Sequence, residues 1–315
     1  MSVWMPSAPC TPRACIEQTG SATAVPRAVA RIAAVVVLML VGIALSPFGG
    51  RIPAGWVRRW CRWIVRAAGV RVRVTGAAAP TGGLLLVANH ISWLDIPLLA
   101  AVRPARMLAK SDIRDWPVAG PVAARGALFI DRNRLRALPD TVARIADALR
   151  AGQAVGVFPE GSTWCGRAQG NFRRAVFQAA LDAEVSVQPV HLGYRVAGGS
   201  ASTAPAFIGE DSLLASVWRV AMTRGLVAEV EVREAIPAGS HPDRRSLAQA
   251  AQPGDTAQPD WTHAALVAGS RSADPSRREN PSAARGKGVT VAFMEVTRRT
   301  RTAAARATSS PAADA

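Results

Sequence analysis

Residues 32–50 form a run of 19 amino acids without a charged side chain, IAAVVVLMLVGIALSPFGG. About 20 such residues are needed for a helix to cross the hydrocarbon core of a bilayer. Pro47 and the glycines after it end the expected helix early, so that it extends over about residues 29–45. A cleaved signal peptide fits poorly, because more than 25 residues precede the run and no small-x-small cleavage site closes it.

The next segment, WVRRWCRWIVRAAG, predicts a strongly amphipathic helix. An aromatic and aliphatic face beside an arginine face is typical of a helix that lies among lipid headgroups. A helix packed on its own domain has the same pattern, so that alternative stays open. Arginines flank both ends of the uncharged run, and a shallow two-helix anchor on one side of the membrane fits at least as well as a true span. At 100° per residue one side collects Trp56, Trp60, Trp63, Ile64 and Ala67, and a separate arc collects Arg58, Arg59, Arg62 and Arg66.

Composition divides the chain into four parts. Residues 1–26 are rich in Pro, Ser and Ala and predict a disordered leader. Residues 27–69 contain the two membrane-associated helices. Residues 70–239 predict a folded α/β domain, and residues 240–315 predict a mostly disordered tail in which short helices are allowed.

The expected domain is α/β, with a mixed, mostly parallel sheet flanked by helices. Short apolar runs alternate there with helical stretches, which is the pattern of strands connected through helices. The expected strands are 70–75, 84–88, 106–109, 127–130, 155–158, 187–191 and 227–232, and the expected helices include 96–102, 138–151, 173–183 and 213–223.

The formal net charge of +16 is unevenly distributed. Residues 1–80 carry ten arginines and one acidic residue, around the most apolar part of the chain. This placement favours an anionic membrane surface as the partner over nucleic acid.

The four cysteines, Cys10, Cys15, Cys61 and Cys165, form no CxxC pair and no cysteine–histidine cluster with zinc spacing. The sequence therefore predicts no metal site, and it predicts free thiols in a reducing compartment.

The stretch LVANHISWLDIPLL, residues 86–99, places His90 directly after a buried strand and Asp95 at an expected helix start. Ligands bind at this end of the strands in open α/β sheets. If the chain turns between them, the Asp95 carboxylate reaches one imidazole nitrogen and leaves the other free to accept a proton from an alcohol. In the alternative interpretation, Asp95 is only a helix cap and His90 a packed loop residue.

Three further segments carry candidate site residues. GVFPEGSTWCGR, residues 156–167, contains a turn whose N–H groups suit an anion, but Ser162 lacks the G-x-S-x-G elbow of a serine hydrolase. GALFIDR ends an expected strand with Arg132, which suits phosphate or carboxylate. In VQPVHL, Pro189 indicates an edge or irregular strand, and His191 is expected to be a packed residue.

Taken in this order, the segments resemble four sequence blocks of the glycerolipid acyltransferase family, which includes the 1-acyl-glycerol-3-phosphate acyltransferases. NHISWLD matches the N-H-x-x-x-x-D block, GALFIDR the second block, FPEGS the F-P-E-G block and VQPV the proline block. The match covers about 100 residues and extends loosely from about residue 30 to 240. One position departs from the pattern: Thr163 stands where the family usually has an arginine that helps to hold phosphate.

The resemblance implies roles for individual residues. The catalytic pair is His90, which activates the acceptor hydroxyl, and Asp95, which orients it. Arg132 contacts the acceptor phosphate, and Glu160, Gly161 and Ser162 belong to the substrate-binding region. Arg173 falls near a position where the family often has a basic residue, and with Arg167 and Arg174 it is a candidate to replace the missing charge.

The sequence thus predicts an O-acyltransferase of lipid biosynthesis on the cytoplasmic face of the cytoplasmic membrane. The donor is an acyl thioester of acyl-carrier protein or CoA, and no cofactor is expected. The first acceptor is 1-acyl-sn-glycerol-3-phosphate, giving phosphatidate. The alternatives are a lyso-aminolipid such as lyso-ornithine lipid as acceptor, a membrane-bound lipid or thioester hydrolase, and a membrane-tethered or nucleic-acid-binding protein without catalysis.

Overall fold

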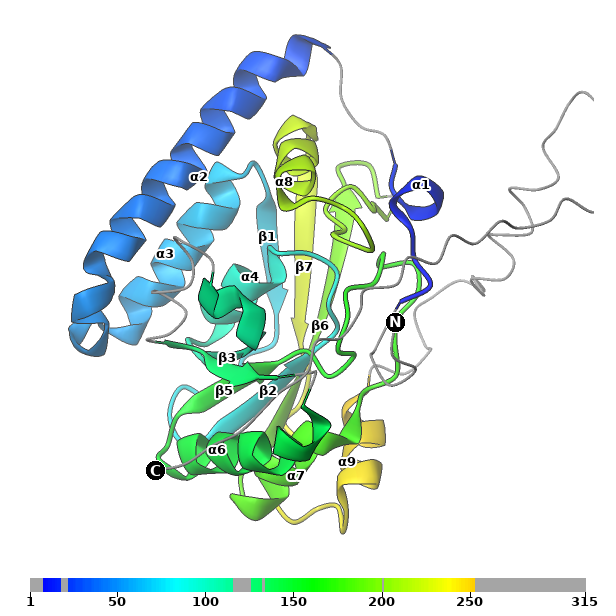
Figure 1. The fold of residues 1–315 in the computed structure, drawn as a ribbon. Coiled ribbons are helices and arrows are strands. Elements are labelled where there is room, and N and C mark those ends of the chain that lie inside the picture. Colours follow the sequence, from blue (N-terminus) through cyan, green and yellow to red (C-terminus); the bar gives the residue numbers. More distant parts are fainter. Residues whose placement is uncertain (1–7, 18–21, 116–125, 132–133, 200, 253–315) are drawn as a thin grey trace, which may run out of the picture. The chain divides into compact units, whose positions relative to one another are not determined.

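Seven strands of the described residues form one sheet in the order β1-β7-β6-β2-β5-β3-β4 (Figure 1). The computed structural model describes residues 8–17, 22–115, 126–131, 134–199 and 201–252. Neighbouring strands are parallel except β6 and β7, which are antiparallel. The prediction of a mixed, mostly parallel sheet is therefore confirmed, and every expected strand is present within a few residues of its predicted bounds. The strands are β1 (Arg71–Thr75), β2 (Leu84–Ala88), β3 (Arg106–Lys110), β4 (Leu128–Ile130), β5 (Ala154–Val157), β6 (Val187–Val196) and β7 (Leu226–Val232).

Helices cover both faces of the sheet, and β2 separates two hydrophobic clusters. Its side chains alternate, with Leu84 and Leu86 in one cluster and Leu85 and Val87 in the other. The first cluster receives α3, α4 and α8, and the second receives α6, α7 and α9 (Figure 1). The α-helices are α1 (Pro12–Cys15), α2 (Val25–Leu45), α3 (Ala54–Ala67), α4 (Asp95–Val102), α6 (Leu138–Arg150), α7 (Phe177–Asp182), α8 (Leu213–Met222) and α9 (Arg244–Ala251), with 3₁₀ turns at η1 (Ala22–Ala24), η2 (Ser46–Arg51), η3 (Ser111–Asp115), η4 (Leu135–Ala137) and η5 (Arg174–Val176).

Helix α2 is fastened to the domain at both ends. The Arg31 guanidinium donates to the carbonyl oxygens of Ala221 (2.7 Å) and Thr223 (2.9 Å), at the carboxyl end of α8, where helical carbonyls lack intrahelical partners. Near the other end, Gly42 lets the α3 residue Trp60 approach, since a Cβ on Gly42 would lie 3.2 Å from the indole nitrogen.

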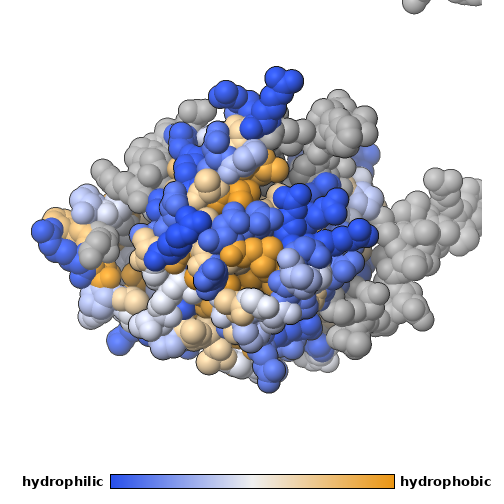
Figure 2. Space-filling model, turned by 90° about the horizontal axis from the view of Figure 1, so that it is seen from below, coloured by the Kyte–Doolittle hydropathy of each residue, from blue (hydrophilic) through white to orange (hydrophobic). Residues whose placement is uncertain are grey.

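The middle of α2 is apolar and exposed. Residues Val25–Phe48 form one helical stretch long and apolar enough to cross a membrane, and only 6% of its most apolar window is buried. Large exposed hydrophobic side chains concentrate on this helix. On the face viewed from below, by contrast, hydrophobic surface is interspersed with hydrophilic residues (Figure 2). The exposed large hydrophobics of α2 are Val25, Val29, Val36, Val37, Met39, Leu40, Val41 and Leu45. This surface is consistent with membrane association.

The tryptophan helix α3 divides its apolar residues between the domain and the surface. Ile64 and Val65 are buried in the domain, whereas Trp56 is 59% exposed. The Arg59 guanidinium lies over the rings of Trp56 and Trp63, at 5.8 and 5.3 Å from their centroids. One side of this helix therefore packs on the protein, as the second interpretation has it, and another side faces outward.

Two segments outside the expected domain bounds contribute to the hydrophobic clusters. Residues 8–17, which we call the N-terminal segment, place Cys10 and Cys15 in the core instead of forming part of a disordered leader. Beyond the expected domain boundary at residue 239, α9 buries Leu247 and Ala248 in the second cluster.

The expectation of an edge strand at Pro189 is wrong, because β6 lies between β7 and β2. The strand is irregular there, as the alternative prediction had it. Val187 forms an isolated bridge with Ile236, and the regular antiparallel ladder with β7 starts at Val190. Pro189 lies in this interruption on the side of β7, where its carbonyl accepts from the Arg233 N–H (3.0 Å), and it pairs in register with Val87 of β2 on the other side.

Candidate active site

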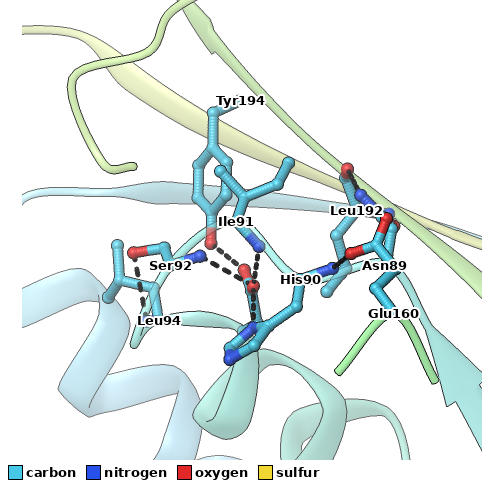
Figure 3. Close-up of polar contacts among 9 residues, drawn as sticks. Asn89, His90, Ile91, Ser92, Leu94, Glu160, Leu192 and Tyr194 are labelled. Atoms are coloured by element: carbon cyan, nitrogen blue, oxygen red, sulfur yellow. Dashed lines mark hydrogen bonds and ion pairs between the residues drawn. The ribbon is translucent and has the colours of Figure 1, made fainter. Parts of the chain in front are cut away.

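His90 and Asp95 meet across a turn between β2 and α4, as the sequence predicts. The strand ends at Ala88, and the helix begins at Asp95. In between, the chain turns so that His90 Nδ1 lies 2.8 Å from Asp95 Oδ2 (Figure 3). The strand–turn–helix geometry is confirmed, and the pair lies at the carboxyl end of a central strand.

The Asp95 carboxylate is fully buried and accepts from the turn that it closes. Besides the imidazole, Oδ2 accepts the backbone N–H groups of Ile91 (2.6 Å) and Ser92 (2.8 Å). The predicted helix cap is wrong in detail, since the N-cap position is Leu94 and Asp95 is the first helical residue. The carboxylate faces back into the turn, where it contacts two backbone N–H groups and the imidazole.

This arrangement fixes the tautomer of His90. Asp95 Oδ2 already accepts from two backbone N–H groups, so in the neutral imidazole Nδ1 is the nitrogen that carries the hydrogen and Nε2 the one with the lone pair. The second ring nitrogen of His90 points away from the hydrogen bond that Nδ1 makes (Figure 3). The ring stacks on Phe158 at 3.9 Å between centroids and 9° between planes, and the side chain keeps 20% exposure. The free nitrogen of a held imidazole is therefore available to take a proton.

Tyr194, the chain's one tyrosine, completes the surroundings of Asp95 and was missed by sequence reasoning. Its hydroxyl donates to Asp95 Oδ1 over 2.6 Å from the buried face of β6. Burial, followed by the nearby Asp95 charge, raises the pKa of Tyr194 well above its usual value, so the hydroxyl remains a hydrogen-bond donor.

Asn89, beside His90, exchanges two hydrogen bonds with the backbone of Leu192 (2.9 and 2.8 Å) and joins the end of β2 to β6.

Glu160 holds the other side of His90. Residues 158–161 form a tight turn in which Gly161 N–H donates to Phe158 O (3.1 Å) and Gly161 has a φ of 76°, which suits glycine. The Glu160 side chain accepts from the backbone N–H of His90 (2.7 Å) and of Gly170 (2.9 Å). Burial raises the pKa of Glu160 to about 8, although both N–H groups oppose the shift. Both carboxyl oxygens of Glu160 are bonded to backbone N–H groups, and the one at His90 helps to position the histidine.

The other predicted site residues have different placements. Ser162 Oγ is buried and has no hydrogen-bond partner within the described residues. Arg173 donates its backbone N–H to Pro159 O (2.9 Å), which brings it beside the turn at Glu160, with its side chain exposed. The side chain of Arg167 pairs with Glu17 of the N-terminal segment. Arg132 lies outside the described residues.

Comparison with known proteins agrees with the site. A family model described as Acyltransferase matches residues 71–193, which include the turn at His90, the turn at Glu160 and most of β6. The chain is 38% identical over 216 residues to a lyso-ornithine lipid O-acyltransferase of Pseudomonas aeruginosa, covering 68% of this chain and 80% of that protein. The sheet and the site thus define an acyltransferase: the chain belongs to the Acyltransferase family.

Other relatives carry two different names. A lyso-ornithine lipid O-acyltransferase of Brucella abortus is 33% identical over 235 residues, covering 69% of this chain and 88% of the relative. A 1-acyl-sn-glycerol-3-phosphate acyltransferase of Neisseria gonorrhoeae is 34% identical over 175 residues, covering 55% and 68%. The solved structure of the 1-acyl-sn-glycerophosphate acyltransferase PlsC from Thermotoga maritima shares the fold, with a TM-score of 0.55 and 18% identity over 72% of this chain and 92% of that one.

Proposed function

We propose that the protein transfers a fatty acyl group from an acyl thioester to the free hydroxyl of a lysolipid, with His90 as general base. The observation that carries the proposal is the 2.8 Å contact of His90 Nδ1 with a fully buried carboxylate, which leaves Nε2 free. The acceptor hydroxyl loses its proton to Nε2 as its oxygen attacks the thioester carbonyl. The C–S bond then breaks, and the thiol of CoA or acyl-carrier protein leaves with that proton.

Asp95 acts through His90 in this proposal. Its charge stabilises the imidazolium that forms when the proton arrives, and the two backbone N–H groups keep the carboxylate in place. General-base assistance of this kind is typically worth about 10²–10⁴ in rate. Backbone N–H groups or arginine donors stabilise the oxyanion of the tetrahedral intermediate.

The first acceptor is 1-acyl-sn-glycerol-3-phosphate, with Arg132 and Arg173 as the expected phosphate contacts. Lyso-ornithine lipid is the second candidate, and two observations favour it. Thr163 supplies no charge where the family usually has arginine, and the Arg167 guanidinium is already paired with Glu17. An ornithine headgroup carries an ammonium and a carboxylate, and it therefore needs less positive charge in the site than a phosphate monoester. The names of the Pseudomonas and Brucella relatives agree with this second candidate.

We place the enzyme on the cytoplasmic face of the cytoplasmic membrane. The exposed apolar surface of α2 and the arginines of α3 support contact with an anionic lipid surface. Both proposed acceptors are lipids, so a site fastened beside this surface would receive them directly from the membrane.

The test measures transfer of a labelled acyl group from acyl-CoA and acyl-carrier protein to a panel of lysolipids. We expect His90→Ala to lower turnover at least about 100-fold. The control is His241→Ala, a partly exposed histidine near α9, which should keep full activity. Equal activity in wild type and His90→Ala would refute the mechanism. Release of free fatty acid without any acceptor would instead identify a hydrolase.

A further inference from the structure

Three cysteine thiols that the proposed reaction does not use converge in the core. The sulfur atoms of Cys10, Cys15 and Cys165 all lie within 4.8 Å of one another, and all three residues are buried. Cys10 and Cys15 belong to the N-terminal segment, and Cys165 belongs to the loop that follows Glu160. The three are free thiols in the structure. Their meeting point joins two segments that are about 150 residues apart in sequence.

This geometry suits a thiophilic metal ion. Zn²⁺ binds thiolate sulfur at about 2.3 Å in a tetrahedral arrangement, which separates two sulfur ligands by about 3.8 Å. A contraction of about 1 Å or less would therefore bring the three sulfurs onto one ion. Cys10 and Cys15 have four residues between them, which lies within the ligand spacing common in zinc sites.

The number of sulfur atoms also favours a metal ion. Three buried sulfurs exceed what a single disulfide needs, since a disulfide joins only two.

We propose that Cys10, Cys15 and Cys165 form a structural binding site for Zn²⁺, with the fourth position taken by a ligand from outside the cluster. The sequence predicts no metal site, because the four cysteines form no CxxC pair and no cysteine–histidine cluster with zinc spacing. Folding supplies that ligand from the loop after Glu160. The proposal rests on these contacts and is independent of the proposed lysolipid chemistry.

The ion would fasten the N-terminal segment to the loop that supports His90. The loop donates the Trp164 N–H to His90 O (2.8 Å) and the Gly170 N–H to Glu160. Besides the sulfur cluster, Glu17 links the two segments through Arg167, and its backbone N–H donates to Thr203 Oγ1 (3.1 Å). Because α1 is only one turn long, the N-terminal segment depends on such contacts for its fixed position, and a bound metal ion would be a strong contact of this kind.

The experiment measures zinc in the full-length protein, purified without chelator, by elemental mass spectrometry. We expect about one Zn²⁺ per chain in the wild type and in Cys61→Ser, which alters the one cysteine outside the cluster. Cys165→Ser and the double variant Cys10→Ser/Cys15→Ser should lose the ion. Removing zinc with a chelator should lower the unfolding midpoint of the wild type by about 5–10 °C and leave that of Cys165→Ser unchanged.

A second measurement needs no variant. Wild-type protein stripped of metal should regain one equivalent of Zn²⁺ on titration, and thiol alkylation should become slower once zinc is restored. Failure to take up zinc would overturn the proposal, as would equal zinc content in Cys165→Ser and wild type. A mass lower by two hydrogens in place of bound metal would identify a disulfide and overturn it as well.

Discussion

Asp95→Asn separates the charge of the Asp95 side chain from its shape. The amide oxygen can take the place of Oδ2 and still accept from His90 Nδ1 and from the N–H groups of Ile91 and Ser92. The amide nitrogen then takes the place of Oδ1 and donates to the Tyr194 hydroxyl, which can accept as well as donate. We therefore expect Asp95→Asn to fold with an unfolding midpoint close to that of the wild type.

Its activity should fall because the imidazolium loses its counter-charge. Two unit charges about 4 Å apart interact by about 4 kcal/mol at an effective dielectric constant near 20. Asp95 is fully buried, but the His90 side chain keeps 20% exposure, and solvent screening lowers the value towards about 2 kcal/mol. At about 1.36 kcal/mol per tenfold, kcat/KM should drop by roughly 30- to 1,000-fold.

The comparison variant Asp95→Ala removes the acceptor altogether. It would leave the donors from His90, Ile91, Ser92 and Tyr194 without a partner, at about 1–3 kcal/mol for each buried group. That sum approaches the whole stability of a typical domain, about 5–15 kcal/mol, so we expect this variant not to fold stably.

The assay pairs acyl-transfer rates with thermal unfolding on the same preparations. The matched control is Asp243→Asn, since the Asp243 carboxylate also accepts two backbone N–H groups, those of Arg245 (2.7 Å) and Ser246 (2.9 Å), but at the start of α9. It should retain wild-type activity. If a folded Asp95→Asn enzyme works within about threefold of wild type, the carboxylate charge has no part in the reaction, and the argument from the His90–Asp95 pair fails.

Two further predictions concern the groups that support His90. Burial raises the pKa of Glu160 to about 8 from an ordinary 4.5, so between these values the folded state holds a proton that the unfolded state has lost. The contribution of Glu160 to the free energy of unfolding is therefore fully present below about pH 4.5 and is lost as the pH rises through 8. Glu160→Gln should therefore show a smaller fall in unfolding midpoint from pH 5 to 8 than the wild type, and parallel curves would contradict this. Tyr194→Phe removes the hydrogen bond to Asp95 Oδ1 and should lower the free energy of unfolding, measured with denaturant, by about 1.5–3 kcal/mol. A decrease below about 0.5 kcal/mol would contradict this prediction.

Much of the sheet was predictable because its signals are local. The run at residues 84–88 is apolar throughout, which is what a strand buried on both faces requires, and its bounds agree with those of β2. The turn between His90 and Asp95 followed from the same local pattern, since the strand ends at Ala88 and the helix starts at Asp95, only seven residues later. The roles of the two residues in catalysis stay predictions.

The partners supplied from a distance were not predictable in this way. Tyr194 reaches Asp95 only because β6 pairs with β2. The sequence around either residue does not indicate which strands are neighbours in the sheet. The N-terminal segment has the composition of a disordered leader, and its order comes from contacts with Cys165, Arg167 and Thr203. Thr163 was recognised from sequence as a missing charge, but the pairing of Arg167 with Glu17 appears only in the fold.

The N-terminal segment also limits how α2 can be inserted. A single crossing of the bilayer by α2 would put Cys10 and Glu17 on one side of it and the domain that follows α3 on the other. Their contacts with Cys165 and Arg167 require both to share one aqueous compartment. Contacts with α8 at its amino end and with α3 near its carboxyl end hold α2 against the domain, so a membrane contact that keeps them would be monotopic.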